Sequence, residues 1–140
     1  MKRRLVVDTS TLIGAAIKPD SIPRRALLLA LSRFELCLSD HLLKELTGVL
    51  ARRQFERYAP AQAFREYVES IQTEARIFTL NAVDLDAVSG QCRDSNDAHI
   101  LALLLISEAD LLISSDNDLL TLHPWRGIPI LTPAQFLEQS

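Results

Sequence analysis

Apolar residues along this chain alternate between short runs and longer stretches with helical spacing. The short runs are rich in β-branched residues and have the length of strands, at residues 5–7, 35–38, 76–80, 111–113 and 128–131. The longer stretches predict helices over residues 24–33 and 41–53, one opened by Pro60, and one capped by Ser95 or Asn96 that continues to Ser107. Strands alternating with helices indicate a mostly parallel sheet covered on both faces. We therefore expect an α/β fold, a three-layer α/β/α sandwich.

The length and composition are typical of one globular domain. The chain has 140 residues, of which 48% are hydrophobic and 24% charged, and this excludes disordered and fibrous classes. No linker, low-complexity tract or repeat interrupts it, so the expected domain spans residues 1–140. The longest apolar run, residues 100–106, is too short to span a bilayer, and no targeting segment is recognisable. The expected location is the cytoplasm.

The net charge of -3 conceals a division along the chain. Basic side chains predominate in the first 60 residues and acidic ones in the remainder. Two interpretations stay open: a phosphate-binding half beside an acidic half, or solvated helix faces sorted by chance. Under the first, the residues expected to contact an RNA backbone are Arg24, Arg25, Arg52 and Arg53.

Two predicted strands lead into an aspartate and hydroxyl side chains. Residues 5–7 are followed by Asp8, and residues 111–113 are followed by Ser114, Ser115 and Asp116. In parallel α/β sheets the ligand site lies outside the carboxyl ends of the strands. We therefore expect Asp8 and Asp116 at the same edge of the sheet.

Two further acids are expected to reach this edge. Glu45 lies among the apolar positions of its helix, near the core boundary, where a charge needs a partner. Asp97 opens the last long helix and can point into the same crevice. Four carboxylates in one crevice repel one another unless cations neutralise them, and all-oxygen ligands suit Mg²⁺ or Mn²⁺. Taken singly, each acid also has a structural explanation as a strand end, a helix cap, a helix-dipole contact or a surface charge.

Together these segments resemble the PIN-domain family, in the branch of toxins from toxin-antitoxin systems. The resemblance extends over about residues 4–137. It rests on Asp8-Thr9-Ser10 after the first strand, Ser39-Asp40 followed by Glu45, residues 92–97 before Leu101-Ala102, and residues 109–120.

The resemblance implies a five-stranded parallel sheet and a metal-dependent endoribonuclease, a hydrolase that cleaves phosphodiester bonds of single-stranded RNA with Mg²⁺ or Mn²⁺. Carried over by position, the catalytic and metal-binding residues are Asp8, Glu45, Asp97 and Asp116. Since the glycines form no phosphate-binding loop and Ser10 has no recognisable triad histidine, the expected nucleophile is water.

Four more residues are implied as supporting members. Ser10 and Ser114 match hydroxyl positions of the family, although Ser114-Ser115 stands where relatives often have Thr followed by Gly. Asp94 either orients Asp97 or water, or is an exposed loop residue. Asp118 either binds a second cation or lies on the surface.

The toxin branch also implies partners. We expect an antitoxin protein and a homo-oligomer, a dimer in the simplest case, with apolar residues 27–31 and 64–68 as contact surfaces. The alternative is that these apolar residues only pack the core.

Two other function classes also place acids or a PIN-like fold in such a chain. A phosphoacceptor signalling domain needs an aspartate ending a middle strand and a late lysine, but residues 78–80 contain no such aspartate and no lysine follows Lys44. A catalytically silent PIN-like scaffold that binds RNA or protein remains the alternative, although four intact acids argue against it.

The histidines and cysteines receive no chemical role from the sequence. His41 lies four residues before Glu45, yet no other histidine has matching spacing, so His41, His99 and His123 are expected to be structural or on the surface. Cys37 and Cys92 lack metal-type spacing and are expected to be reduced, buried thiols.

Overall fold

A computed structural model describes residues 2–139 and contains one five-stranded sheet in the order β3-β2-β1-β4-β5. All neighbouring strands are parallel, with Leu5 opposite Leu36 on one side and Leu111 on the other. The predicted parallel sheet is therefore confirmed. The strands are β1 (Arg4–Val7), β2 (Glu35–Ser39), β3 (Arg76–Phe78), β4 (Leu111–Ile113) and β5 (Ile130–Leu131).

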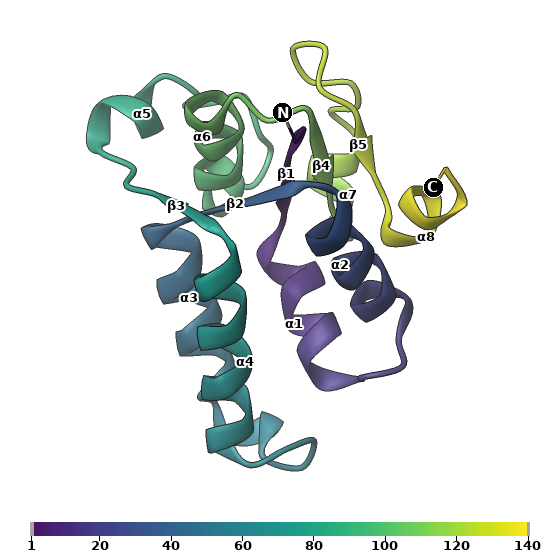
Figure 1. Ribbon diagram of the computed structural model, residues 1–140. Coiled ribbons are helices and arrows are strands. Elements are labelled where there is room, and N and C mark those ends of the chain that lie inside the picture. The colour runs from purple at the N-terminus through teal and green to yellow at the C-terminus, as the bar shows by residue number, and fades with distance from the viewer. Residues whose placement is uncertain (1, 140) are drawn as a thin grey trace.

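Helices cover the two faces of this sheet (Figure 1). The chain moves from β1 to β2 in one direction and from β3 to β4 in the other, so right-handed crossovers place their helices on opposite faces. On one face α2 packs against α1 and α8, and on the other α6 lies against β1, β2 and β3. The helices are α1 (Thr9–Ile17), α2 (Ile22–Arg33), α3 (Asp40–Leu50), α4 (Ala61–Glu74), α5 (Ala82–Asp86), α6 (Ala98–Ser107), α7 (Asn117–Leu120) and α8 (Pro133–Glu138), with 3-10 turns at Arg53–Phe55 and Ser95–Asp97.

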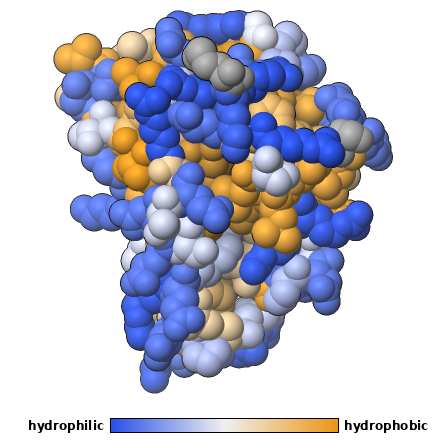
Figure 2. Space-filling view, in the orientation of Figure 1, coloured by the Kyte–Doolittle hydropathy of each residue, from blue (hydrophilic) through white to orange (hydrophobic). Residues whose placement is uncertain are grey.

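The core extends over both faces of the central strands and includes buried residues of α1 and α2 as well as of α6. Residues of β1 and β4 are buried, and α6 is buried around most of its circumference, which explains why its sequence is the longest apolar run of the chain. Figure 2 shows hydrophilic side chains over most of one face of the molecule, with apolar side chains gathered across its middle. Within residues 2–139, no helix is both long and apolar enough to cross a bilayer.

Several element boundaries differ from the prediction. Helix α1 was not predicted, because its β-branched residues and Gly14 favour helix only weakly; α5 and α8 were also missed. Helix α3 ends at Leu50 and not at residue 53, and helix α6 starts at Ala98 after a separate 3-10 turn. Strands β3 and β5 are shorter than predicted, and Ile128 pairs with Trp125 in a turn before β5.

The apolar segments expected to form contact surfaces contribute mainly to the core. Leu27, Phe64 and Val68 are buried, whereas Leu28 is 56% exposed. Both cysteines are buried and free, as expected, and burial raises the pKa of the Cys37 thiol to about 11. Apart from the exposed Leu28, these side chains are therefore explained by packing.

Candidate active site

Asp8 follows the carboxyl end of β1 and lies in a buried position at the start of α1. Asp8 is 2% exposed, and its Oδ1 accepts a hydrogen bond from the Thr11 amide at 3.0 Å as the N-cap of the helix. The hydroxyls of Ser10 and Ser114 also donate to this carboxylate. Burial raises the pKa of Asp8, while these hydrogen bonds act in the opposite direction. Asp8 is therefore fixed in one orientation but poorly solvated.

The carboxyl end of β4 brings Asp116 beside Asp8, as predicted for two strand ends at one sheet edge. The buried Ser114 hydroxyl donates to Asp8 and accepts from the Asp116 amide at 3.0 Å, so it links the two strand ends. Asp116 in turn caps α7, because its Oδ1 accepts from the Asp118 amide at 2.9 Å. A second link joins the hydroxyls of Thr11 and Ser115 at 2.9 Å.

Asp97 enters the site from the start of α6. Its Oδ2 is buried and has no hydrogen-bond partner within residues 2–139, and its side chain does not cap the helix. Burial raises the pKa of Asp97 to about 7, and the neighbouring carboxylates of Asp116, Asp94 and Asp8 add to this shift. A partly buried carboxylate that has one buried oxygen without a partner and lies among other acids is the electrostatic setting that a bound cation relieves.

Glu45 reaches the site from the middle of α3 and contacts His99, which in turn stacks on His41; neither histidine received a role from the sequence. Its Oε1 lies 3.4 Å from Nε2 of the buried His99, and burial lowers the pKa of this imidazole. The His99 ring stacks on His41, with ring centroids 4.5 Å apart and 14° between the planes. One signal was visible in the sequence, since His41 lies one helical turn before Glu45. The position of His99, from a distant segment, was not.

All four predicted acids line one pocket of about 200 Å³, together with Ser10 and the apolar side chains of Ile13, Val49 and Ile100. They come from four separate elements, at the ends of β1 and β4, on α3 and at the start of α6. Carboxylate and hydroxyl oxygens are ligands that Mg²⁺ or Mn²⁺ favours, and the unpartnered Asp97 oxygen adds to the match. The residues present therefore fit a divalent cation.

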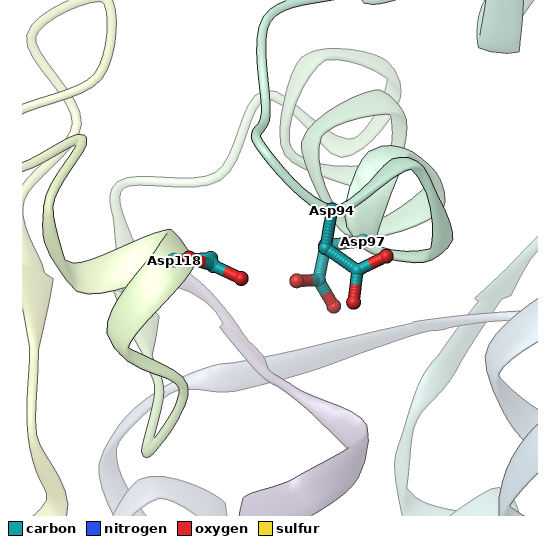
Figure 3. A group of neighbouring side chains, drawn as sticks. All are labelled: Asp94, Asp97 and Asp118. Atoms are coloured by element: carbon teal, nitrogen blue, oxygen red, sulfur yellow. The ribbon is translucent and has the colours of Figure 1, made fainter.

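The two uncertain acids, Asp94 and Asp118, lie next to this pocket. One oxygen from each of Asp94, Asp97 and Asp118 falls within 4.8 Å of the others, and Figure 3 shows Asp118 extending from α7 toward the other two. Asp94 also caps the 3-10 turn before α6 through the Asn96 amide. Asp97 therefore belongs to both groups of acids.

The predicted phosphate-binding arginines lie apart from the acidic pocket. Arg24 donates to the Ala15 carbonyl at 3.0 Å and lies over the Tyr67 ring, so its guanidinium holds α1 against α4. Arg25, Arg52 and Arg53 are exposed and do not line the pocket. The His123 ring accepts from the Ile130 amide at 2.8 Å, which is a structural role in the turn before β5.

Comparison with known proteins adds a family and a fold. A sequence profile of the PIN domain matches residues 4–118. No curated protein sequence matches the chain.

Three solved structures share the fold at low sequence identity. The toxin VapC20 from Mycobacterium tuberculosis, described as cleaving the sarcin-ricin loop, is 16% identical, with a TM-score of 0.63, over 89% of this chain and 98% of that one. A chain of Rickettsia felis VapBC2, bound to a promoter DNA fragment, is 15% identical, with a TM-score of 0.65, over 92% of this chain and 98% of that one. A chain of DNA-bound VapBC from Salmonella typhimurium is 20% identical, with a TM-score of 0.62, over 94% of this chain and 98% of that one.

Proposed function

Since the chain belongs to the PIN-domain family, we propose that it is a metal-dependent endoribonuclease whose single nuclease domain spans residues 1–140. The observation that supports this most strongly is the meeting of four acids from four separate elements in one small pocket. A scaffold that had lost catalysis would have no need to retain an acid such as Asp97, which has one buried oxygen without a hydrogen-bond partner within residues 2–139.

Asp8, Glu45, Asp97 and Asp116 would hold Mg²⁺ or Mn²⁺ in this proposal, with Asp94 and Asp118 beside them. The bound ion would lower the pKa of a water molecule that it holds and neutralise charge on the phosphate under attack. The chain's own contribution is to keep the carboxylates in place. Ser114 and the Thr11 amide fix Asp8, and the Asp118 amide fixes Asp116.

The surroundings of the acids support action on a single strand. The pocket is small, and its walls Ile13, Val49 and Ile100 are apolar, so one backbone fits more readily than a duplex. An apolar wall also strengthens the electrostatic interactions inside it. The Ser10 hydroxyl lines the pocket, but it donates to Asp8, which would hold the metal, and no histidine is among the described residues that line the pocket. Water is therefore the proposed nucleophile.

We further propose that the chain is the toxin of a toxin-antitoxin pair and forms a dimer. The family assignment supports this, and two of the similar structures are VapBC complexes. Ile22 and Leu28, which are 46% and 56% exposed on α2, are apolar side chains that a partner would cover. Light scattering of the purified chain, alone and with the product of the adjacent reading frame, tests both parts. A monomer at every concentration, with no complex, would refute them.

Cleavage assays test the enzymatic proposal. The purified chain is incubated with labelled single-stranded RNA, double-stranded RNA and single-stranded DNA, with Mn²⁺, with Mg²⁺ or with EDTA. We expect cleavage of single-stranded RNA that depends on the added metal and stops with EDTA. Binding of RNA without any cleavage would support the silent scaffold instead, and cleavage that resists EDTA would contradict the metal-dependent mechanism.

A further inference from the structure

His41 lies beside the acidic pocket and presents an aromatic ring to solvent. It is exposed in the first turn of α3, directly after the carboxyl end of β2. Its ring stacks on the buried His99, which lies 3.4 Å from Glu45. Because stacking covers one face of an imidazole, the second face of the exposed His41 ring remains accessible.

Two further pockets share His41 as a lining residue, and both also share Glu45 with the acidic pocket. The first, of about 540 Å³, is lined by Asp40, His41, Lys44, Glu45 and Leu80, without His99. The second includes His41, Glu45 and His99 together with Leu85 and Arg93. Glu45 lines both of these and the acidic pocket, so His41 lies in the pockets that adjoin the acids.

The chemistry of this region suits a nucleotide. Lys44 and Arg93 are exposed cations, one in each pocket, that can contact backbone phosphates. Leu80 and Leu85 provide apolar walls for a base. Besides Glu45, one acid lines each pocket: Asp86 lines the second, and Asp40 lines the first, where its Oδ1 is engaged by the amides of His41 at 2.8 Å and Leu80 at 3.2 Å.

We propose that the His41 ring is a stacking platform for one base of the RNA strand, close to the phosphate that is cleaved. Single-stranded RNA is commonly held by stacking of unpaired bases on aromatic side chains, including histidine. His99 packs against one face of the His41 ring and also contacts Glu45. In this proposal, binding of the base is therefore coupled to the position of the Glu45 carboxylate. This inference rests on the proposed ribonuclease function and adds a substrate-binding residue to it.

An abasic scan of the substrate tests the platform. A series of oligoribonucleotides, each lacking one base near the cleaved bond, is cleaved by the parent, His41→Ala and His41→Phe. In the parent, removal of one particular base should lower kcat/KM about tenfold, mainly through KM. His41→Ala should show a similar loss with the complete substrate and no further loss when that base is missing. His41→Phe keeps a flat ring on His99 and should resemble the parent.

Controls separate the possible failures. Tyr58→Ala removes another exposed ring, from the loop between α3 and α4, and should leave every rate unchanged. Thermal melts establish that each variant is folded. If the parent cleaves RNA but the effects of His41→Ala and the missing base simply multiply, the platform is wrong while the ribonuclease function stands. If the parent cleaves no RNA, both proposals fail.

Discussion

The Asp97 carboxylate is held in the pocket with one buried oxygen that has no hydrogen-bond partner within residues 2–139. Burial and three neighbouring acids raise its pKa to about 7, above the ordinary value of 3.8. In the metal-free protein this side chain is therefore a source of instability near neutral pH. An acid with a purely structural role behaves differently: Asp110, for example, accepts a hydrogen bond from the Arg4 amide at 2.8 Å.

This difference predicts the stability of Asp97→Asn without metal. A carboxyl whose pKa is higher in the folded state stabilises the fold below its unfolded pKa, and the contribution is lost as the pH rises through the folded value. Between pH 5 and pH 8 in EDTA, the Tm of the parent should therefore fall relative to that of Asp97→Asn, which should be the more stable at pH 8. Melts of both proteins across this range give the comparison.

Asp110→Asn is the matched control for that experiment, because it removes a charge that is hydrogen bonded in the fold. Its Tm should be equal to or below that of the parent at pH 8. Asp8 and His99 also have shifted pKa values, so the informative quantity is the difference between parent and Asp97→Asn, which share both groups. If the difference in Tm between the parent and Asp97→Asn does not change with pH, the Asp97 carboxylate is not destabilised by the neighbouring acids.

At the level of elements, the site depends on the joint between β1 and β4, by which we mean the hydrogen bonds of Ser114 that link the carboxyl ends of these two strands. The Ser114 hydroxyl contacts Asp8 and the Asp116 amide at once, and it is fully buried. Removing it leaves a buried carboxylate and an amide without this partner. The joint therefore contributes both to folding and to the placement of two acids.

Ser114→Ala should lower the free energy of unfolding by about 1–2 kcal/mol, the usual cost of losing a buried hydrogen-bond partner. It should also reduce RNA cleavage by about tenfold or more, as expected for residues that orient metal ligands. Ser114→Thr keeps the hydroxyl and should recover most of the activity. Denaturant titration and cleavage rates measure the two effects. Equal rates for Ser114→Ala and the parent would remove Ser114 from the site.

The sequence predicted the elements whose pattern is local. Strand ends at Asp8 and Asp116 followed from apolar runs that stop on polar residues, and their meeting followed from the rule for parallel sheets. Helix α1 was missed because its β-branched residues and Gly14 are weak helix formers, and its stability depends on packing and on the Asp8 cap. The stacking of His41 on His99 joins segments far apart in the chain, and no spacing within one segment indicates it.

At the level of the whole molecule, the fold brings the acids together before any cation is bound. The parallel order of the strands sets the ends of β1 and β4 side by side, and α3 and α6 add Glu45 and Asp97. The repulsion between these carboxylates opposes folding. A bound cation neutralises the repulsion and so stabilises the folded state. Metal binding and fold stability should therefore be linked.

Millimolar Mn²⁺ should raise the Tm of the parent by about 5 °C or more, because a ligand that binds only the folded state stabilises it by mass action. The shift should shrink strongly in Asp97→Asn, since this acid belongs to both groups around the pocket. Thermal melts with increasing Mn²⁺ measure this effect. An unchanged Tm in the parent at millimolar metal would argue against a cation site.

The most direct measurement of the central claim is the rate of single-stranded RNA cleavage by Asp8→Asn, Asp97→Asn and Asp116→Asn at saturating Mn²⁺. Each change keeps the size of the side chain and removes its charge, and melting curves establish that the variants are folded. If the acids act together as one metal-dependent site, each variant alone should cleave RNA more than about 100-fold more slowly than the parent. A folded Asp8→Asn or Asp97→Asn that cleaves RNA at close to the parent rate would contradict this assignment of the active site.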